Sequence, residues 1–126
     1  LVVDQWFSMQ ASCPLPGTLG KVKALMAHEA FTMKNPNRMR SLVSAFAFQN
    51  TVNFHAKDGS GYEFLAEREI ELNEINPQMA ARILSPLTRW RNYDGARQSL
   101  MKDQLNRILS IEAISPDVFE IASKSV

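Results

Sequence analysis

The sequence has a single cysteine, Cys13, among its 126 residues, so no disulfide can form within the chain. A lone thiol fits a reducing compartment, and we expect a cytoplasmic protein. An excess of one charge sign is also missing, because 14 Lys and Arg residues face 13 Asp and Glu residues. Nucleic-acid binding needs clustered, uncompensated positive charge, so we expect no nucleic-acid partner.

Long hydrophobic runs are missing as well. Residues 1–7 contain neither a basic region nor an extended apolar stretch, so we expect no signal peptide, no membrane span and no membrane partner. The apolar residues of this segment already follow helical spacing, and we therefore expect the chain to be a piece cut from a longer protein. Residues 51–55 alternate only briefly and have no partner run, so no convincing strand is present.

Helical periodicity is what the sequence does contain. Apolar residues recur at spacings of three and four, which is the pattern of one buried helix face. The clearest groups are Leu19, Val22, Leu25 and Met26; Met39, Leu42, Val43 and Phe46; Met79, Ile83, Leu87 and Trp90; and Met101, Leu105, Ile108 and Leu109. Each group predicts a helix with one face in the core.

Three helix starts share one dipeptide chemistry, a side-chain oxygen at the N-cap followed by proline at the first helical position. They are Asn35-Pro36, Asn76-Pro77 and Ser115-Pro116, separated by 41 and 39 residues. This spacing is close to the ~40–47-residue repeat of stacked helix pairs. We predict an all-α fold in which residues 1–126 form a single helical domain of stacked antiparallel helix pairs, part of an α-superhelix of the HEAT or armadillo type. Ser60 with Glu63 predicts a further start, a capping box.

Candidate catalytic groups are few. His28-Glu29 opens like the zinc-binding HExxH motif, but Thr32 stands where the second histidine is needed and His55 is far away in sequence. Cys13 has no histidine or basic neighbour that would activate a thiol nucleophile. We predict no metal site and no catalytic residue in this chain.

A run of carboxylates on one predicted helix is the remaining candidate for acid–base chemistry. The run consists of Glu67, Glu69, Glu71 and Glu74. Such residues more often form a solvent-exposed helix face, here together with Arg68, and that is our prediction.

Arginines near the helix starts are more informative. Arg38 and Arg40 follow the first start, and Arg82 follows the second, with Gln78 one turn earlier on the same face. A cation near a helix start opposes the helix dipole and needs a compensating interaction. A structural ion pair or contact with an anionic ligand would supply it, and the residues alone favour the ion pair.

Longer strings of the sequence carry a family resemblance. In order, these are residues 31–42, residues 54–65, Asn76-Pro77-Gln78 with Ala81-Arg82 and Pro86-Leu87, and Tyr93-Asp94 with Arg97-Gln98. They resemble the last part of the C-terminal domain of bacterial-type aminopeptidase N, and the likeness covers nearly the whole chain. The resemblance implies a parent enzyme that is a zinc-dependent exopeptidase and removes N-terminal residues from peptides.

The resemblance also implies a division of labour. Zinc and the catalytic residues would belong to the parent's own catalytic domain, which is the expected partner of this chain, and this chain would hold no cofactor. The helical domain would enclose the substrate cavity, with Arg40, Gln78 and Arg82 facing it and contacting the peptide substrate, including its carboxylate end. A helical-repeat scaffold that binds protein partners on its concave face is the alternative.

Overall fold

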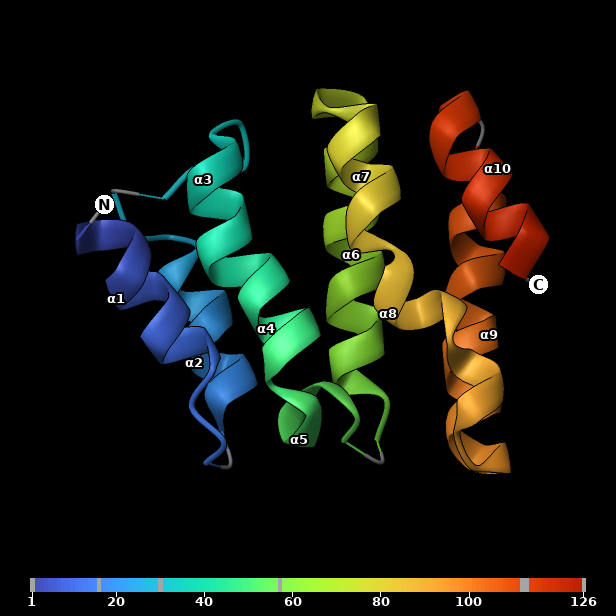
Figure 1. Cartoon of the computed structure of the whole chain (residues 1–126), viewed down its shortest axis with the longest axis horizontal. Coiled ribbons are helices and arrows are strands. Elements are labelled where there is room, and N and C mark those ends of the chain that lie inside the picture. The colour runs from blue at the N-terminus through green and yellow to red at the C-terminus, as the bar shows by residue number, and fades with distance from the viewer. Residues whose placement is uncertain (1, 16, 30, 57, 112–113, 126) are drawn as a thin grey trace. The chain divides into compact units, whose positions relative to one another are not determined.

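The computed structural model describes residues 2–15, 17–29, 31–56, 58–111 and 114–125, and for residues 2 and 3 it describes the backbone alone. Every element within these ranges is helical and no strand occurs among them, which confirms the all-α prediction (Figure 1). The chain divides into two compact units, Leu1–Ala56 and Lys57–Val126. The single helical domain over residues 1–126 stays a prediction.

The first unit is built around one interrupted helix. Its elements are α1 (Val2–Ala11), α2 (Thr18–Leu25), α3 (Pro36–Met39), the π-helical turn η1 (Arg40–Ser44), α4 (Ala45–Gln49) and α5 (Thr51–Phe54). Helix α1 packs against η1 and α2. The predicted apolar face Met39, Leu42, Val43 and Phe46 is fully buried, whereas only Val22 is buried in the predicted face of α2.

A buried asparagine, Asn50, links the end of α1 to the start of α5. Asn50 Nδ2 donates to the carbonyl oxygens of Ala11 at 2.9 Å and Cys13 at 2.7 Å. Its Oδ1 accepts from the Asn53 backbone N–H at 3.2 Å and so caps α5. Residues 51–54, which alternate in the sequence, therefore form a short helix and not a strand.

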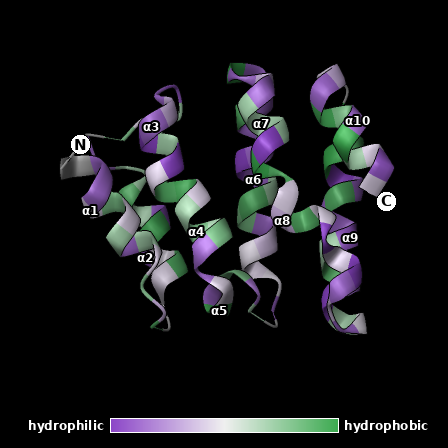
Figure 2. Cartoon of the chain, in the orientation of Figure 1, coloured by the Kyte–Doolittle hydropathy of each residue, from purple (hydrophilic) through white to green (hydrophobic). Residues whose placement is uncertain are grey.

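The second unit consists of helices that pack in pairs, with α6 against α7 and α9. Its elements are α6 (Ser60–Ile75), α7 (Pro77–Ile83), α8 (Ser85–Thr88), the 3-10 turn η2 (Trp90–Asn92), α9 (Gly95–Leu109) and α10 (Pro116–Ser125). Helix α6 contacts α7 and α9, and α10 contacts α7 and α9 as well. The longer helices carry both hydrophobic and hydrophilic residues, as expected for helices with one face in a core (Figure 2). No helix within the described residues has the length and apolar content needed to cross a membrane.

The apolar group that begins at Met79 is divided among separate helices. Met79 and Ile83 are buried on α7, and Leu87 is buried on α8. Pro86 explains the break, because proline lacks the N–H that would continue the ladder and is tolerated in the first turn of a new helix. On α9 the predicted face is one helix, with Met101, Leu105 and Ile108 fully buried.

The three predicted helix starts are confirmed. Asn35 Oδ1 accepts from the backbone N–H groups of Asn37 at 3.0 Å and Arg38 at 3.3 Å. Asn76 Oδ1 accepts from the Met79 N–H at 3.2 Å, and Ser115 Oγ from the Val118 N–H at 3.3 Å. These contacts satisfy N–H groups that have no partner inside the helix.

The predicted capping box at Ser60 and Glu63 is wrong. Helix α6 begins one residue earlier than that prediction requires, because the N-cap is Gly59 with φ 77°, a left-handed conformation that favours glycine. Asp58 Oδ1 instead accepts from both the backbone N–H of Ser60 at 2.9 Å and its Oγ at 2.6 Å. A Cβ on Gly59 would also lie 3.2 Å from the side chain of Leu100, so packing adds crowding to the backbone preference for glycine.

Candidate functional site

A surface depression between α7 and α10 is the best candidate site in the second unit. It has a volume of about 440 Å³ and is lined by Gln78, Ala81 and Arg82 from α7 and by Asp117, Glu120 and Ile121 from α10. Each helix contributes positions i, i+3 and i+4, which share one face. A volume of this size is within the ~300–1,000 Å³ range of small-ligand sites. Two of the three predicted substrate-binding residues, Gln78 and Arg82, therefore line the same depression.

Burial on the opposite faces orients these two helices. On α7 the buried residues include Met79, Ala80 and Ile83, and this leaves Gln78 and Arg82 exposed. On α10 the buried residues are Val118 and Ala122, which leaves the acidic side chains exposed. The apolar periodicity of both helices therefore leaves the polar lining side chains at the surface.

The depression carries both signs of charge. Arg82 lies on α7 and Asp117 and Glu120 on α10, and no ion pair found within the described residues joins Arg82 to either carboxylate. Glu120 Oε1 instead accepts from Lys124 Nζ at 3.0 Å. These two side chains are 64% and 74% exposed, and such surface pairs contribute only about 0–1 kcal/mol. Both charge signs therefore remain accessible to a ligand.

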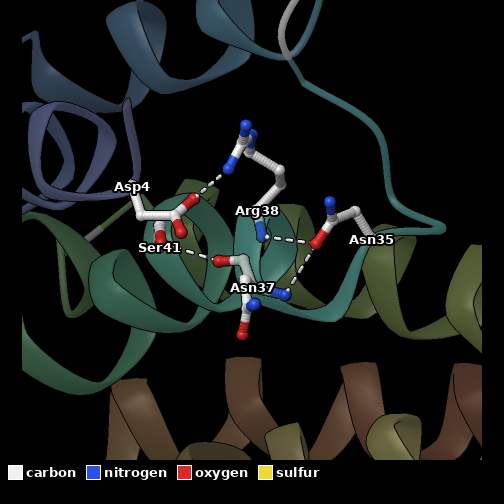
Figure 3. Close-up of polar contacts among 5 residues, drawn as sticks. All are labelled: Asp4, Asn35, Asn37, Arg38 and Ser41. Atoms are coloured by element: carbon white, nitrogen blue, oxygen red, sulfur yellow. Dashed lines mark hydrogen bonds and ion pairs between the residues drawn. The ribbon is translucent and has the colours of Figure 1, made fainter. Parts of the chain in front are cut away.

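In the first unit, Arg38 forms an ion pair, and it is one of the two arginines that follow the predicted helix start. Arg38 Nη1 donates to Asp4 Oδ1 at 2.6 Å, which joins α3 to α1 (Figure 3). The same helix start is held by the Asn35 cap and by Ser41 Oγ, which donates to the Asn37 carbonyl at 2.6 Å. The favoured ion-pair interpretation is thus confirmed for Arg38.

Arg40 has different surroundings. It is exposed, whereas Met39, Ser41 and Leu42 around it are buried, and it forms no ion pair with another described residue. Arg40 opens the π-helical turn η1, in which its carbonyl accepts from the Ala45 N–H five residues later. Such turns are rare and are frequent at functional sites. The substrate-binding role of Arg40 stays a prediction, as do those of Gln78 and Arg82.

The histidines and the cysteine occupy packing positions. His28 lies with its ring 5.6 Å from that of Trp6 and 5.9 Å from that of Phe7. His55 stacks edge-on against Phe54, with the ring centroids 4.9 Å apart. Cys13 is a half-buried free thiol. Among the residues that the structure describes, no three His, Cys, Asp or Glu side chains come together as a metal site would require, so this part of the chain does not fit a zinc ion.

The predicted solvent-exposed carboxylate face of α6 is wrong for one residue. Glu71 and Glu74 are exposed and Glu67 lies 3.8 Å from Arg107, but Glu69 is fully buried. Neither carboxylate oxygen of Glu69 has a hydrogen-bond partner within the described residues. Burial raises the pKa of Glu69 from 4.5 to about 9, because a charged carboxylate is poorly solvated there. Glu69 is therefore a neutral group at physiological pH.

Asp117 and Glu120 are site residues that the sequence analysis missed. Their signal was available, because Ser115-Pro116 predicts the start of α10 and both carboxylates follow it at a spacing that places them on one face. What the sequence could not supply was the packing of α10 against α7, which lie far apart along the chain.

Comparisons with known proteins agree on the region to which the chain corresponds. The family described as "Domain of unknown function (DUF3458_C) ARM repeats" matches residues 1–126. Aminopeptidase N of Escherichia coli (strain K12) is 46% identical over 126 residues, which cover 100% of this chain and 14% of that protein. Aminopeptidase N of Haemophilus influenzae is 47% identical over 126 residues, with the same shares. The crystal structure of Legionella pneumophila aminopeptidase A in complex with aspartic acid has a TM-score of 0.91 at 37% identity and covers 98% of this chain and 14% of that one.

These similarities define what is matched. The chain spans only 14% of the length of these aminopeptidase N relatives, and the matched stretch is their C-terminal part. The ARM-repeat description agrees with the predicted HEAT or armadillo type of fold.

Proposed function

This chain belongs to the DUF3458_C family of ARM repeats, and on that premise we propose that it serves a zinc-dependent aminopeptidase as the helical domain that encloses the substrate cavity. The proposed parent removes N-terminal residues from peptides and acts in the cytoplasm, and its catalytic domain is the partner of this chain. The full-length match to aminopeptidase N supports this proposal. The same match does not favour the alternative, a protein-interaction scaffold.

Zinc would be held by the proposed catalytic domain, since the described residues offer no ligand set. The chemistry that such an ion would supply there is activation of water for hydrolysis of the peptide bond. The present residues would act on the remainder of the peptide by binding it and by limiting access of bulk water.

The depression between α7 and α10 is the observation on which the proposal depends. Arg82 is exposed there with Gln78 one turn away, and no described carboxylate is bonded to it. A guanidinium group can bind a peptide carboxylate through two parallel N–H···O bonds and stays charged at any physiological pH. The Gln78 amide can donate to and accept from the peptide backbone. Arg40 would supply a second cation for the same class of ligand.

The test is Arg82→Ala in the intact aminopeptidase that contains this chain. Short peptides with a free C-terminal carboxylate are compared with the same peptides ending in an amide. Because charge-assisted hydrogen bonds contribute about 1.5–3 kcal/mol and this site is exposed, we expect KM to rise about tenfold for the free acids and much less for the amides.

Arg89→Ala is the matched control, because Arg89 is also exposed but does not line the depression. This variant should leave both substrate classes unchanged. Equal losses for acids and amides with Arg82→Ala, or no loss for either, would contradict the proposed role of Arg82.

A further inference from the structure

The acidic face of α10 makes the depression more than an anion site. Asp117, Glu120 and Ile121 occupy one face of α10, and Arg82 lines the same depression from α7. A site for a carboxylate alone would have no need of two further carboxylates, which repel an anionic ligand and weaken its binding. The mixture of charges instead suits a ligand that itself carries both signs.

We infer that Asp117 and Glu120 select peptides with a basic side chain at their carboxylate end. The inference rests on the proposed function and names its substrate class. Arg82 binds the terminal carboxylate, and the α10 carboxylates bind the lysine or arginine side chain of the same residue. Ala81 and Ile121 line the same depression and offer apolar surface for the hydrocarbon stem.

Helix geometry supports this assignment. Packed helices lie about 8–10 Å apart axis to axis, and α7 and α10, which pack against each other, line one depression. The four-carbon stem of lysine carries its ammonium group over a comparable span and ends in three rotatable donors. One C-terminal lysine can therefore reach both faces of the depression at once.

The two α10 carboxylates differ in their availability. Asp117 forms none of the ion pairs found within the described residues, and it lies in the first turn of α10, where the helix dipole stabilises its charge. Glu120 is bonded to Lys124, but both side chains are mostly exposed. A substrate cation can displace Lys124 at little cost, because such a pair is weak. Asp117 is accordingly the first contact and Glu120 the second.

The experiment uses the intact aminopeptidase and two tripeptide substrates, Leu-Gly-Lys and Leu-Gly-norleucine, both with free carboxylates. Norleucine keeps the hydrocarbon stem of lysine and lacks its charge. The readout is the ratio of kcat/KM for the two peptides. In the Asp117→Asn/Glu120→Gln variant this ratio should fall about three- to tenfold, the range expected for charges at a partly exposed site. Glu120→Lys should lower it further by repulsion.

Two further variants test this inference separately from the proposed function on which it rests. Asp103→Asn removes an exposed carboxylate of α9 outside the depression and should leave the ratio unchanged. Arg82→Ala should weaken the binding of both free-acid peptides to the same extent. An unchanged ratio in the double variant, with Arg82→Ala still distinguishing acids from amides, would overturn the inference and leave the proposed function intact. If Arg82→Ala also gives equal losses for the free acids and the amides, the inference and the proposed function are both wrong.

Folding of the variants is controlled separately. Asp117 belongs to the first turn of α10, so its replacement weakens a favourable dipole interaction. Glu120→Gln alone leaves that turn intact and should still lower the lysine-to-norleucine ratio about twofold, a smaller share of the same electrostatic effect. A ratio unaffected by Glu120→Gln in a variant with native far-ultraviolet circular dichroism would count against the role of Glu120.

Discussion

Two helix starts of this chain share one dipeptide, yet the arginines that follow them have different surroundings. After Asn35-Pro36, Arg38 forms an ion pair with Asp4 of α1 at 2.6 Å. After Asn76-Pro77, Arg82 stays exposed and lines a depression. The cap is a local property of a few residues, whereas the use of the arginine depends on which helix packs beside it. A shared start chemistry therefore does not imply a shared role.

Carboxylates of the two units differ in the same way. Asp4 in the first unit has a cationic partner, and its oxygen accepts a charge-assisted hydrogen bond. Glu69 in the second unit is fully buried, and neither of its oxygens has a partner within the described residues. Asp4 is therefore stabilised as a charged group by its partner, whereas Glu69 stays protonated.

Replacing Glu69 should give the largest change in the free energy of unfolding. Below pH 4.5 its carboxyl is neutral in the folded and unfolded states alike. Between 4.5 and about 9 only the unfolded state loses the proton, so stability falls as pH rises. At about 1.4 kcal/mol per pH unit, the loss is on the order of 3 kcal/mol at pH 7. Glu69→Leu should remove this slope and raise the free energy of unfolding at pH 7 by a similar amount, measured by urea unfolding at pH 5, 7 and 8.

Glu71→Leu is the matched control, since the same substitution is made on the same helix at an exposed position. Its effect should stay within about 0.5 kcal/mol and show no comparable pH dependence. A wild-type stability that does not change between pH 5 and 8 would contradict the assignment of Glu69 as a buried neutral acid.

Removing the ion pair between Arg38 and Asp4 should give an intermediate loss of stability. Arg38→Ala and Asp4→Ala each remove one partner of a bond whose side chains are 24% and 19% exposed. Partial burial places the expected loss at about 1–2 kcal/mol for each variant, with a double variant that loses less than the sum. Chemical unfolding of the four members of this cycle measures the coupling.

Arg40→Ala tests whether pairing is what distinguishes these arginines. Arg40 is two residues from Arg38 on the same interrupted helix but is exposed and forms no ion pair with another described residue. Its removal should change the free energy of unfolding by less than about 0.5 kcal/mol. A loss equal to that of Arg38→Ala would mean that Arg40 is structural and would remove the reason to expect it at a ligand.

The helices were predictable where the signal is local. Asn35, Asn76 and Ser115 cap their helices as their dipeptides predict, because an N-cap involves only the next three residues. The failures have tertiary causes. Glu69 lies in a run of acidic residues that has the composition of an exposed face, and the helices packed around α6 bury it.

The site was predictable only in part for the same reason. Gln78 and Arg82 are one turn apart, so helical spacing alone places them on one face of α7. Asp117 and Glu120 complete the depression from a helix more than thirty residues later, and no local pattern relates the two faces. The ion pair of Arg38 likewise depends on Asp4, which lies 34 positions away along the chain.

The two asparagine caps should give a modest and nearly equal loss of stability. Asn35→Ala and Asn76→Ala each remove the side-chain oxygen that accepts the N–H bonds of the first turn, and each should lower the free energy of unfolding by about 1 kcal/mol. Asn→Asp at either position keeps that oxygen and should retain most of the stability, as thermal unfolding followed by circular dichroism would show. Near-equal losses would establish that the two starts are the same device and that only their neighbours differ. If Asn35→Ala cost much more than Asn76→Ala, the Asn35 cap would also be supporting the Arg38–Asp4 bond, and the comparison between the two starts would no longer separate local from tertiary causes.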